Sequence, residues 1–446
     1  MEEFLIKALQ LFLSLSILVI VHEFGHFLLA KLFKIRVEKF YLFFDAGFAL
    51  FRYKPKKSET EFGIGWLPLG GYVKIAGMID ESFDTEQMKQ EPQPWEFRTK
   101  PAWQRLLVMA AGALFNFILA WFIYCMMLFA WGDTYISAKD LKYGMTYSDV
   151  AKSVGFQDGD KIISADGKDF VMRGGILAVN DMMQFLDANK ILVERDGKEV
   201  LIDIPDDFGD RVIGSKKGLF QEKVLPVVDS VMENTIAQKV GIQKGDSIVK
   251  INDANVASFS DFQKEIMNND GSKTFTILLY RDTALVQIDD VKLSQGELLG
   301  VSVSRDVLQD AVKTKTYSFF ASLTAGGKLG YETFKAYVSQ MRFLFSKEGL
   351  SNLGGFGTMG SMFAPIWDWH YFWMMTAFLS IALGFLNLLP IPMLDGGHIV
   401  FLLYEAITRR KPSDKFMEHA QIIGLLIVLG LVIIANGNDI IRAFFK

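Results

Sequence analysis

The chain has 446 residues and a formal net charge of −4, and its 47 Lys and Arg nearly balance its 51 Asp and Glu, which argues against both a strongly basic nucleic-acid-binding protein and an acidic disordered tail. Half of the residues are hydrophobic and 39 are Phe, which is too apolar for a soluble enzyme unless the excess is gathered into membrane-spanning segments. Cys125 is the only cysteine, so an intramolecular disulfide and a zinc site built from cysteines are excluded.

Four segments are long and apolar enough to cross a bilayer as helices. They are Phe4 to Leu32, Leu106 to Trp131, Tyr371 to Leu389 and Ala420 to Ala435. The first follows Glu2 and Glu3 and lacks a small-residue cleavage site, so we expect it to remain as an anchor rather than to be removed as a signal peptide. Lys and Arg flank the 31–105 and 405–419 loops, which the positive-inside rule places in the cytoplasm. The 132–370 segment and both chain ends then lie on the other side.

The first span carries the pentapeptide His22-Glu23-Phe24-Gly25-His26. Residues four apart share one face of a helix, so both imidazoles can bind one zinc ion while Glu23 lies beside the metal-bound water. A pair of histidines without metal is the alternative. Ionisable groups inside an apolar span cost about 2.5–3.5 kcal/mol each, and a zinc ion compensates this cost. We therefore expect a metal site here.

The stretch from Phe62 to Ile75 alternates hydrophobic residues with others and is rich in glycine, including Gly65, Gly70 and Gly71. This pattern predicts a twisted β-hairpin. The hairpin either lies near the active site or is a plain surface feature, and the pattern alone leaves both open.

The segment between the second and third spans contains an internal repeat. Residues 154–163 reappear 86 positions later as residues 240–249, with six identities in ten. Each copy is followed by short β-patterned runs, such as Ile191 to Glu194 and Thr274 to Tyr280. We predict two tandem α/β modules, whose Gly-x-x-x-Gly-Asp turn before a strand resembles that of PDZ domains, which bind extended peptides at a sheet edge. A duplicated spacer without ligand is the alternative.

A helical pattern of hydrophobic residues runs from about Val312 to Leu350. Lys and polar residues interrupt it, so the segment is amphipathic and could lie along the membrane surface. A plain helix that bridges the modules and the third span fits the pattern equally well.

A hydrolytic zinc ion needs a third protein ligand and an open position for water. The remaining candidates are His370, Asp395, His398 and His419. Depth in the membrane favours Asp395, because it follows the third span at its cytoplasmic end, and His22 and His26 lie near the cytoplasmic end of the first span. His370 lies at the opposite end of the third span.

The run from Asn387 to His398 interrupts the end of the third span. Pro390, Pro392 and two glycines break the helix there, and a broken backbone at membrane depth is tolerated only where it is buried in protein or lines a cavity. Asn387 could donate a hydrogen bond to a developing oxyanion or hold an extended substrate backbone. Capping of a bent helix end by Asn387 and Asp395 is the alternative.

Together these motifs resemble the site-2 protease family (family M50) of intramembrane zinc metalloproteases, and most closely its bacterial branch of regulator-of-sigma-E proteases. The resemblance rests on His-Glu-x-x-His in the first span, on the later Asn-x-x-Pro-x-x-x-x-Asp-Gly and on the modules between, and it covers nearly the whole chain. It implies that His22, His26 and Asp395 bind Zn²⁺ and that Glu23 is the catalytic base. The substrate-binding residues that it implies are Asn387, Gly65, Gly70, Gly71, Pro390 and Pro392. One departure is Ala113, which stands where relatives usually have the proline of Gly-Pro-x-x-Asn.

The predicted fold is a polytopic α-helical membrane protein with four transmembrane helices, a membrane-associated β-hairpin loop and two tandem PDZ-like α/β domains. In this scheme residues 1–34 hold the first span, 35–102 a cytoplasmic, membrane-reentrant β-loop region, 103–132 the second span, 133–225 and 226–310 the PDZ-like domains, 311–370 an amphipathic connector, 371–404 the third span with its motif, and 405–446 a cytoplasmic loop with the fourth span.

The resemblance implies hydrolysis of peptide bonds within single-span proteins of the bacterial inner membrane. The zinc site is expected towards the cytoplasmic side and the PDZ-like domains in the periplasm. Implied substrates are pre-trimmed anti-sigma factors or signal-peptide remnants, and no nucleic-acid partner is expected. A membrane zinc transporter and a catalytically inactive PDZ scaffold remain as alternative functions. Zinc flux into sealed vesicles favours the first, and full function after Glu23→Gln favours the second.

Overall fold

The structure is a computed structural model that describes residues 2–68, 70–78, 91–215, 218–267, 274–294, 297–304, 310–344 and 353–445. The chain forms two compact units. One consists of Met1–Gly132 with Thr316–Lys446, and the other of Asp133–Lys315. The first unit contains the long apolar helices, and the second contains the internal repeat.

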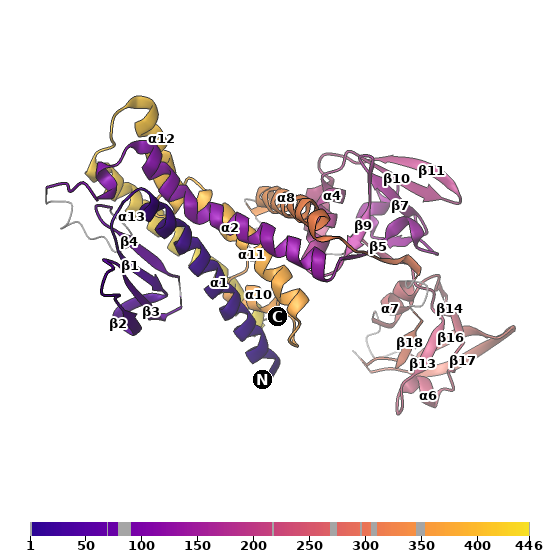
Figure 1. The fold of residues 1–446 in the computed structure, drawn as a ribbon. Helices are drawn as coiled ribbons and strands as arrows, with labels where there is room; N and C mark the ends of the chain where they lie inside the picture. The colour runs from indigo at the N-terminus through magenta and orange to yellow at the C-terminus, as the bar shows by residue number, and fades with distance from the viewer. Residues whose placement is uncertain are drawn as a thin grey trace. The chain divides into compact units, whose positions relative to one another are not determined.

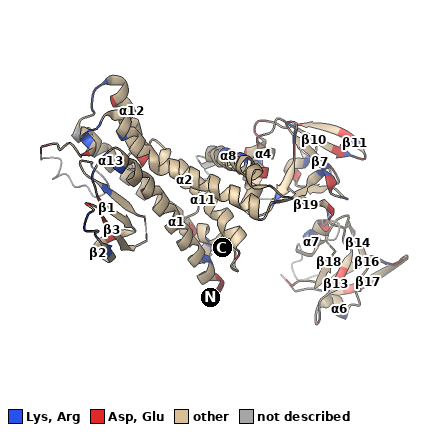
Figure 2. Cartoon of the chain, viewed as in Figure 1, with Lys and Arg blue, Asp and Glu red and all other residues tan. Residues whose placement is uncertain are grey.

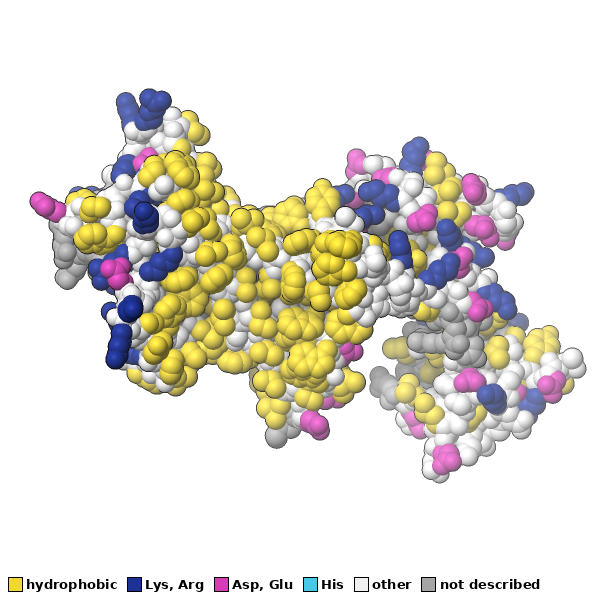
Figure 3. All heavy atoms as spheres, in the orientation of Figure 1, with side chains coloured by type: hydrophobic (Ala, Val, Ile, Leu, Met, Phe, Trp, Pro, Cys, Tyr) yellow, Lys and Arg dark blue, Asp and Glu magenta, His cyan; other side chains and the backbone are white. Residues whose placement is uncertain are grey.

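Four helices of the described chain are long and apolar enough to cross a membrane. They are α1 (Glu2–Leu32), α2 (Ala102–Ala130), α11 (Trp369–Leu388) and α13 (Asp414–Phe445). A helix is present at each of the four predicted spans, although α13 extends beyond the expected 420–435 at both ends because its polar flanks continue the helix. Hydrophobic side chains cover this bundle (Figure 3), and Lys and Arg are nearly absent from its middle (Figure 2). The protein is therefore a membrane protein.

Helix α2 is the centre of this unit. It packs against α1, α11, α12 (Asp395–Thr408) and α8 (Phe319–Leu344), as Figure 1 shows. Ring contacts of Phe129 with Phe319 at 5.8 Å and of Phe117 with Phe334 at 5.7 Å show that α8 runs antiparallel along α2. A β-carbon at Gly326 of α8 would lie 2.6 Å from the backbone of α2. The amphipathic pattern did not predict this close contact, because small residues that let helices approach carry no hydrophobic signal.

A short helix, α10 (Phe356–Ser361), connects the ends of α1 and α13. The Asp439 carboxylate of α13 accepts hydrogen bonds from the backbone N–H groups of Gly355 at 3.0 Å and Thr358 at 2.9 Å. Gln10 of α1 donates to the carbonyl of Ala364 at 2.8 Å. Polar contacts therefore join these two helices to residues 355–364, which contain α10.

The first unit also contains a four-stranded sheet. Its strands are β1 (Val37–Leu42), β2 (Phe44–Tyr53), β3 (Glu61–Leu67) and β4 (Tyr72–Ile75), followed by the short helix η2 (Phe97–Thr99). The order is β2-β3-β1-β4, in which β1 is parallel to β3 and antiparallel to β4. The predicted hairpin over residues 62–75 is wrong, because β1 lies between its two strands.

The glycines of β3 explain why the hairpin pattern was misleading. A β-carbon at Gly63 would lie 2.4 Å from the ring of Tyr41, and one at Gly65 would lie 2.2 Å from the carbonyl oxygen of Phe44. These glycines therefore allow neighbouring parts of the chain to pack closely on β3, and they do not form a tight turn.

The second unit consists of small sheets and short helices. Its first part contains β5 (Asp133–Ser137), η3 (Ala138–Asp140), β6 (Met145–Tyr147), α3 (Asp149–Lys152), β7 (Lys161–Ala165), β8 (Lys168–Asp169), β9 (Val171–Arg173), α4 (Leu177–Leu186), β10 (Lys190–Arg195), β11 (Lys198–Asp203), α5 (Phe208–Ser215) and β12 (Phe220–Glu222). Its second part contains β13 (Val228–Val231), α6 (Ile236–Lys239), β14 (Ser247–Ile251), β15 (Ala254–Asn255), α7 (Phe259–Met267), β16 (Thr274–Arg281), β17 (Ala284–Lys292) and β18 (Val301–Val303). The last strand, β19 (Val312–Lys315), returns to the first part and pairs with β5. The main sheets have the matching orders β11-β10-β7-β8 and β15-β14-β16-β17.

The two parts also share an ion pair at equivalent positions. Arg195 donates to Asp160 at 2.7 Å, and Arg281, 86 positions later, donates to Asp246 at 2.8 Å. Each arginine also donates to the carbonyl of a glycine in its own copy of the repeat. The sequence repeat therefore corresponds to a repeat in structure, whereas its assignment to PDZ domains stays a prediction.

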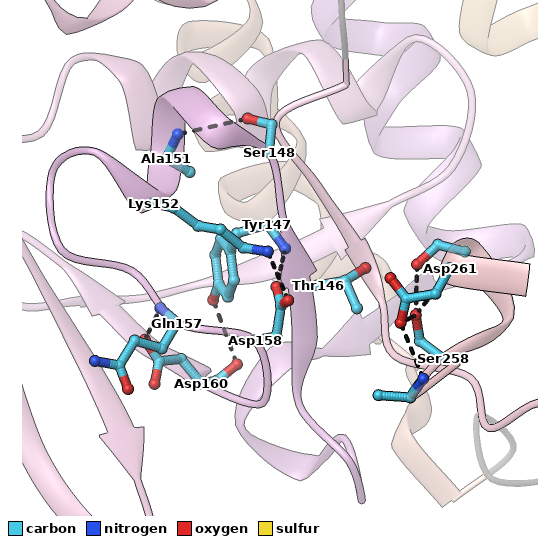
Figure 4. Close-up of polar contacts among 12 residues, drawn as sticks. Thr146, Tyr147, Ser148, Ala151, Lys152, Gln157, Asp158, Asp160, Ser258 and Asp261 are labelled. Atoms are coloured by element: carbon cyan, nitrogen blue, oxygen red, sulfur yellow. Dashed lines mark hydrogen bonds and ion pairs between the residues drawn. The ribbon is translucent and has the colours of Figure 1, made fainter. Parts of the chain in front are cut away.

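A polar cavity of about 310 Å³ lies between β6 and the start of α7 (Figure 4). On one side, Asp158 accepts hydrogen bonds from Lys152 Nζ at 2.6 Å and from the backbone N–H of Tyr147 at 2.8 Å. On the other side, Ser258 donates to Asp261 at 2.8 Å. These polar side chains are held by contacts within their own parts of the unit.

Replacing Asp246 with Asn is expected to weaken the second repeat by about 1.5–3 kcal/mol, which is typical of a hydrogen bond to a charged group. Burial opposes the ionisation of Asp246, but hydrogen bonds from Arg281 and the Gln243 backbone outweigh it and lower the pKa of Asp246 below its ordinary 3.8. This stabilisation is therefore present above pH 3.8 and is lost as the pH falls further. Hydrogen exchange of β14 and β16 in the full-length protein measures it.

The matched control for this prediction is Asp229→Asn, because Asp229 pairs with Lys244 through exposed side chains at 3.0 Å. Such surface pairs contribute about 0–1 kcal/mol. Equal exchange in the two variants at pH 7, or a difference that does not shrink at low pH, contradicts the prediction.

Candidate metal centre

Two imidazoles and a carboxylate from two helices meet at one point. His22 and His26 lie one turn apart on α1, and Asp395 is the first residue of α12. Asp395 Oδ2 lies 3.2 Å from His22 Nε2 and 3.3 Å from His26 Nε2, and the two Nε2 atoms are 3.2 Å apart. Two nitrogens and one oxygen around one point are a donor set of catalytic zinc sites, which keep a fourth position open for water.

Helices α1 and α2 lie close together beside this centre because a glycine stands at each point where they touch. A β-carbon at Gly25 would lie 2.5 Å from the carbonyl oxygen of Ala111. A β-carbon at Gly112 would lie 2.3 Å from His26 Nε2 and 2.6 Å from His22 Cε1. The two imidazoles therefore use the space that Gly112 leaves on the face of α2.

The bend between α11 and α12 places Asp395. Met393 in this bend has a φ of 88°, a left-handed conformation that is costly for a residue other than glycine. A β-carbon at Gly396 would lie 2.1 Å from the carbonyl oxygen of Leu389, so the first turn of α12 packs directly on the start of the bend. The interruption predicted from prolines and glycines is present, and it turns the chain so that Asp395 faces α1.

Glu23 lies beside the three residues and faces a cavity of about 500 Å³. The cavity lining includes His22, Glu23, His26, Tyr72, Val73, Lys74, Ile75, Met393, Asp395, His398 and Gln421. Strand β4 is an edge strand and forms one wall, and the backbone of Val73 hydrogen-bonds Glu23. One cavity therefore joins a carboxylate, the candidate metal ligands and the edge of a sheet.

The sequence model of peptidase family M50 matches residues 10–431 of the chain. It belongs to this family. A putative zinc metalloprotease of Vibrio cholerae is 27% identical over 99% of this chain and 100% of its own length. Regulator of sigma-E protease RseP of Escherichia coli is 28% identical over 99% of this chain and 100% of its own length, and protease RseP of Yersinia pestis is 28% identical over 96% and 97%. The family predicted from the motifs is confirmed, and the relatives' names agree with the expected zinc.

The other M50 residues implied by the resemblance lie at different distances from the centre. Asn387 Nδ2 lies 3.4 Å from both ring nitrogens of His22, and Gly71 lines the cavity. A β-carbon at Gly70 would lie 3.1 Å from the ring of Phe44. Gly65, Pro390 and Pro392 do not line the cavity. Gly65 packs on β2, and Pro390 is exposed in the bend. Pro392 packs on α13, where a β-carbon at Gly424 would lie 1.7 Å from the carbonyl oxygen of Pro392.

The remaining histidines of this M50 chain separate into two groups. His370 packs on the ring of Trp131 with a centroid distance of 5.3 Å, and His419 bonds the carbonyl of Lys415 at 2.6 Å. Neither belongs to the cluster of His22, His26 and Asp395 that could hold a metal ion. His398 lines the cavity, and its Nε2 lies 3.5 Å from Gln421. Of the four candidates for a third ligand, Asp395 is the one whose carboxylate lies within 3.3 Å of both histidine rings.

Three residues of α2 that the sequence reasoning did not assign to the site contact the histidines. Gly112 lies under both rings, the Val108 carbonyl lies 2.8 Å from His26 Nδ1, and Asn116 Nδ2 lies 3.3 Å from His22 Nδ1. The signal was present in the 111–116 segment, where Gly112 and Asn116 match the Gly-Pro-x-x-Asn pattern of the family.

Proposed function

We propose that the protein is an intramembrane zinc metallopeptidase that hydrolyses peptide bonds within the membrane-spanning segments of single-span proteins. The observation that carries the proposal is the convergence of His22, His26 and Asp395, with Glu23 beside them, in one cavity among helices apolar enough to span a membrane. Membership of peptidase family M50 and the names of the relatives support this reading. In this proposal the three converging residues are the zinc ligands.

The proposed chemistry is metal-assisted hydrolysis. Zinc, when bound, polarises the scissile carbonyl and lowers the pKa of a water molecule. Glu23 accepts the proton of the attacking water and delivers it to the leaving amine. Asn387, next to His22, donates its amide hydrogen to the substrate carbonyl or to the developing oxyanion.

Substrate is held in an extended form along β4. A membrane-spanning helix satisfies its carbonyls internally, so it must unwind before a carbonyl reaches the centre, and its freed backbone groups then need new partners. Among the described strands, β4 is at the edge of its sheet and lies in the wall of the cavity, and Gly71, which precedes it, packs closely on Val19 and the carbonyl of Tyr41. Addition of a substrate strand to this edge supplies these partners.

The proposed location is the bacterial inner membrane, with the zinc centre towards the cytoplasm and the PDZ-like modules in the periplasm. Lys and Arg of the strands β1 and β2 and of the α12–α13 connection support this orientation (Figure 2). The proposed substrates are anti-sigma factors already trimmed by another protease, or signal-peptide remnants. Residues 133–310 then exclude membrane proteins that still carry a bulky external domain.

The test is hydrolysis of a panel of single-span helices by the purified full-length protein. Each helix is supplied with and without a folded external domain, and each reaction is run with and without a zinc chelator. Glu23→Gln is expected to lower the rate by about 10²–10⁴-fold, because it removes the general base, while zinc content stays unchanged. Chelation is expected to stop cleavage, and trimmed helices are expected to be cleaved faster than untrimmed ones.

The matched control is Glu332→Gln on the outer face of α8, which removes a carboxylate from an exposed pair with Lys328. It is expected to cleave at the wild-type rate. Equal activity of Glu23→Gln and wild-type protein contradicts the peptidase and favours a scaffold. Zinc flux into sealed vesicles without peptide cleavage favours a transporter.

A further inference from the structure

One face of α2 presents a polar partner to each of the two histidines. Val108, Gly112 and Asn116 are spaced four residues apart, so they lie above one another on this face. His26 Nδ1 lies 2.8 Å from the carbonyl oxygen of Val108, and His22 Nδ1 lies 3.3 Å from Asn116 Nδ2. Gly112 between them leaves space for both rings. The same helix therefore contacts the far nitrogen of each imidazole.

The positions of these partners decide where each ring carries its proton. Both Nε2 atoms face Asp395, so they are the atoms that bind a metal ion and must be unprotonated when they do. The proton is then on Nδ1, which needs a hydrogen-bond acceptor. The carbonyl oxygen of Val108 is an acceptor and fixes this tautomer for His26. His22 instead faces a side-chain amide.

An amide differs from a carbonyl because it offers both an acceptor and a donor. Rotation of the Asn116 amide by half a turn exchanges Oδ1 and Nδ2, and the two orientations have the same shape. With Nδ2 towards His22, the ring accepts at Nδ1 and its Nε2–H donates to Asp395. With Oδ1 towards His22, Nδ1–H donates to Asn116, and Nε2 is free to bind metal.

Asn116 is placed to carry out this exchange without other changes. Its side chain is fully buried, and its Oδ1 has no hydrogen-bond partner among the described residues. Its backbone is held in place, because Ser380 of α11 donates to the carbonyl of Asn116 at 2.7 Å. The buried oxygen therefore gains a partner when the amide turns towards a protonated Nδ1 of His22.

Asn387 does not select the tautomer in the same way. Its Nδ2 lies 3.4 Å from Nδ1 and 3.4 Å from Nε2 of His22, so it contacts the edge of the ring that carries both nitrogens. A group equally far from both nitrogens does not favour a proton on either of them. The selective contact is the one from α2.

We propose that Asn116 is a positioning residue for the metal centre, whose side-chain oxygen accepts the Nδ1 proton of His22 in the zinc-bound state and whose amide nitrogen donates to Nδ1 in the metal-free state. The inference deepens the proposed peptidase and rests on it. It assigns to α2 the orientation of both imidazoles, one through a main-chain carbonyl and one through a side chain.

The test is the zinc affinity of the full-length protein in detergent, measured by competition with a chelator at neutral pH. Asn116→Leu keeps the size of the side chain but removes the acceptor, and it is expected to weaken zinc binding by about 10–100-fold. Asn116→Asp keeps an acceptor towards His22, and its affinity is expected to be at least that of the wild type. Rescue by Asp separates the loss of an acceptor from a disturbance of packing.

The matched control is Tyr124→Phe, which removes a fully buried hydroxyl from the same helix away from the histidines. It is expected to bind zinc like the wild type. The proposal is overturned if Asn116→Leu binds zinc as tightly as this control, or if Asn116→Asp binds it as weakly as Asn116→Leu. If Asn116→Leu does not fold, the affinity of Asn116→Asp decides alone, since a 10-fold loss there overturns the proposal.

The proposed function and this inference fail in different ways. If the wild-type protein binds no zinc, both are overturned. If the wild type and Glu23→Gln bind zinc tightly and Asn116→Leu does so equally, only the role of Asn116 is overturned.

Discussion

Replacing Gly112 with Ala is expected to abolish zinc binding and peptide cleavage while the fold remains. The added β-carbon would lie 2.3 Å from His26 Nε2 and 2.6 Å from His22 Cε1, whereas real β-carbons essentially never come within 3.0 Å of such atoms. Helix α2 cannot easily retreat from α1, because α8, α11 and α12 also pack against it. The rings therefore move, and Nε2 leaves the point that it shares with Asp395.

The expected loss of zinc affinity is larger than the loss of about 10–100-fold that follows when a ligand loses only its own hydrogen-bond partner, because two ligands are displaced together. Metal content after dialysis and chelator competition measure it. Gly430→Ala is the matched control, since a β-carbon there meets nothing within 4 Å on another apolar helix. A Gly112→Ala protein that retains zinc like this control contradicts the close approach of Gly112 to the two imidazoles.

The residues of the centre that the sequence indicated share a simple property. His22, Glu23 and His26 lie within one helical turn, so their spacing alone places them together. Asp395 comes from a distant helix, and only the agreement of depths in the membrane connected it to them. Ionisable side chains can be identified from the sequence in this way because they are unusual in an apolar segment. The spans themselves can be identified as well, because hydropathy is summed over many residues.

The parts that the sequence did not indicate depend on contacts between distant backbones. Gly326 lies where the backbone of α2 approaches too closely for a side chain, and Gly112 lies where two histidine rings of α1 take that space, and nothing in the local pattern identifies either neighbour. The pairing of β3 and β4 with β1 rather than with each other has the same origin. Alternation predicts that a segment is a strand, but it does not predict which strand lies beside it.

Asn116 illustrates a third limit. A single buried amide in an apolar helix is as consistent with packing between helices as with a role at the centre, because both bury one polar group. Its position eight residues after Val108 became informative only once His22 and His26 were seen against the same face of α2. The structure therefore adds the partner, which decides between the two readings.

Breaking the ion pair between Arg105 and Glu405 is expected to destabilise the membrane unit by about 3–5 kcal/mol. Arg105 in the first turn of α2 donates to Glu405 of α12 at 2.5 Å, and both side chains are largely buried. Arg105→Met leaves the Glu405 carboxylate buried without its partner, so the temperature of unfolding in detergent falls. Because α12 begins at Asp395, weaker zinc binding is expected to accompany the loss.

The double variant Arg105→Met with Glu405→Leu tests the cause. Replacing both charges by apolar side chains removes the unpaired carboxylate, so most of the stability is expected to return. Lys328→Met is the control, because Lys328 belongs to an exposed pair with Glu332 that contributes at most about 1 kcal/mol. If Arg105→Met unfolds at the same temperature as this control, the pair does not hold α12 on α2. If the double variant is no more stable than Arg105→Met, the unpaired carboxylate is not the cause. The loss then lies in the other contacts of Arg105, whose guanidinium lies over the ring of Phe97 and donates to the carbonyl of Lys100 at 2.9 Å.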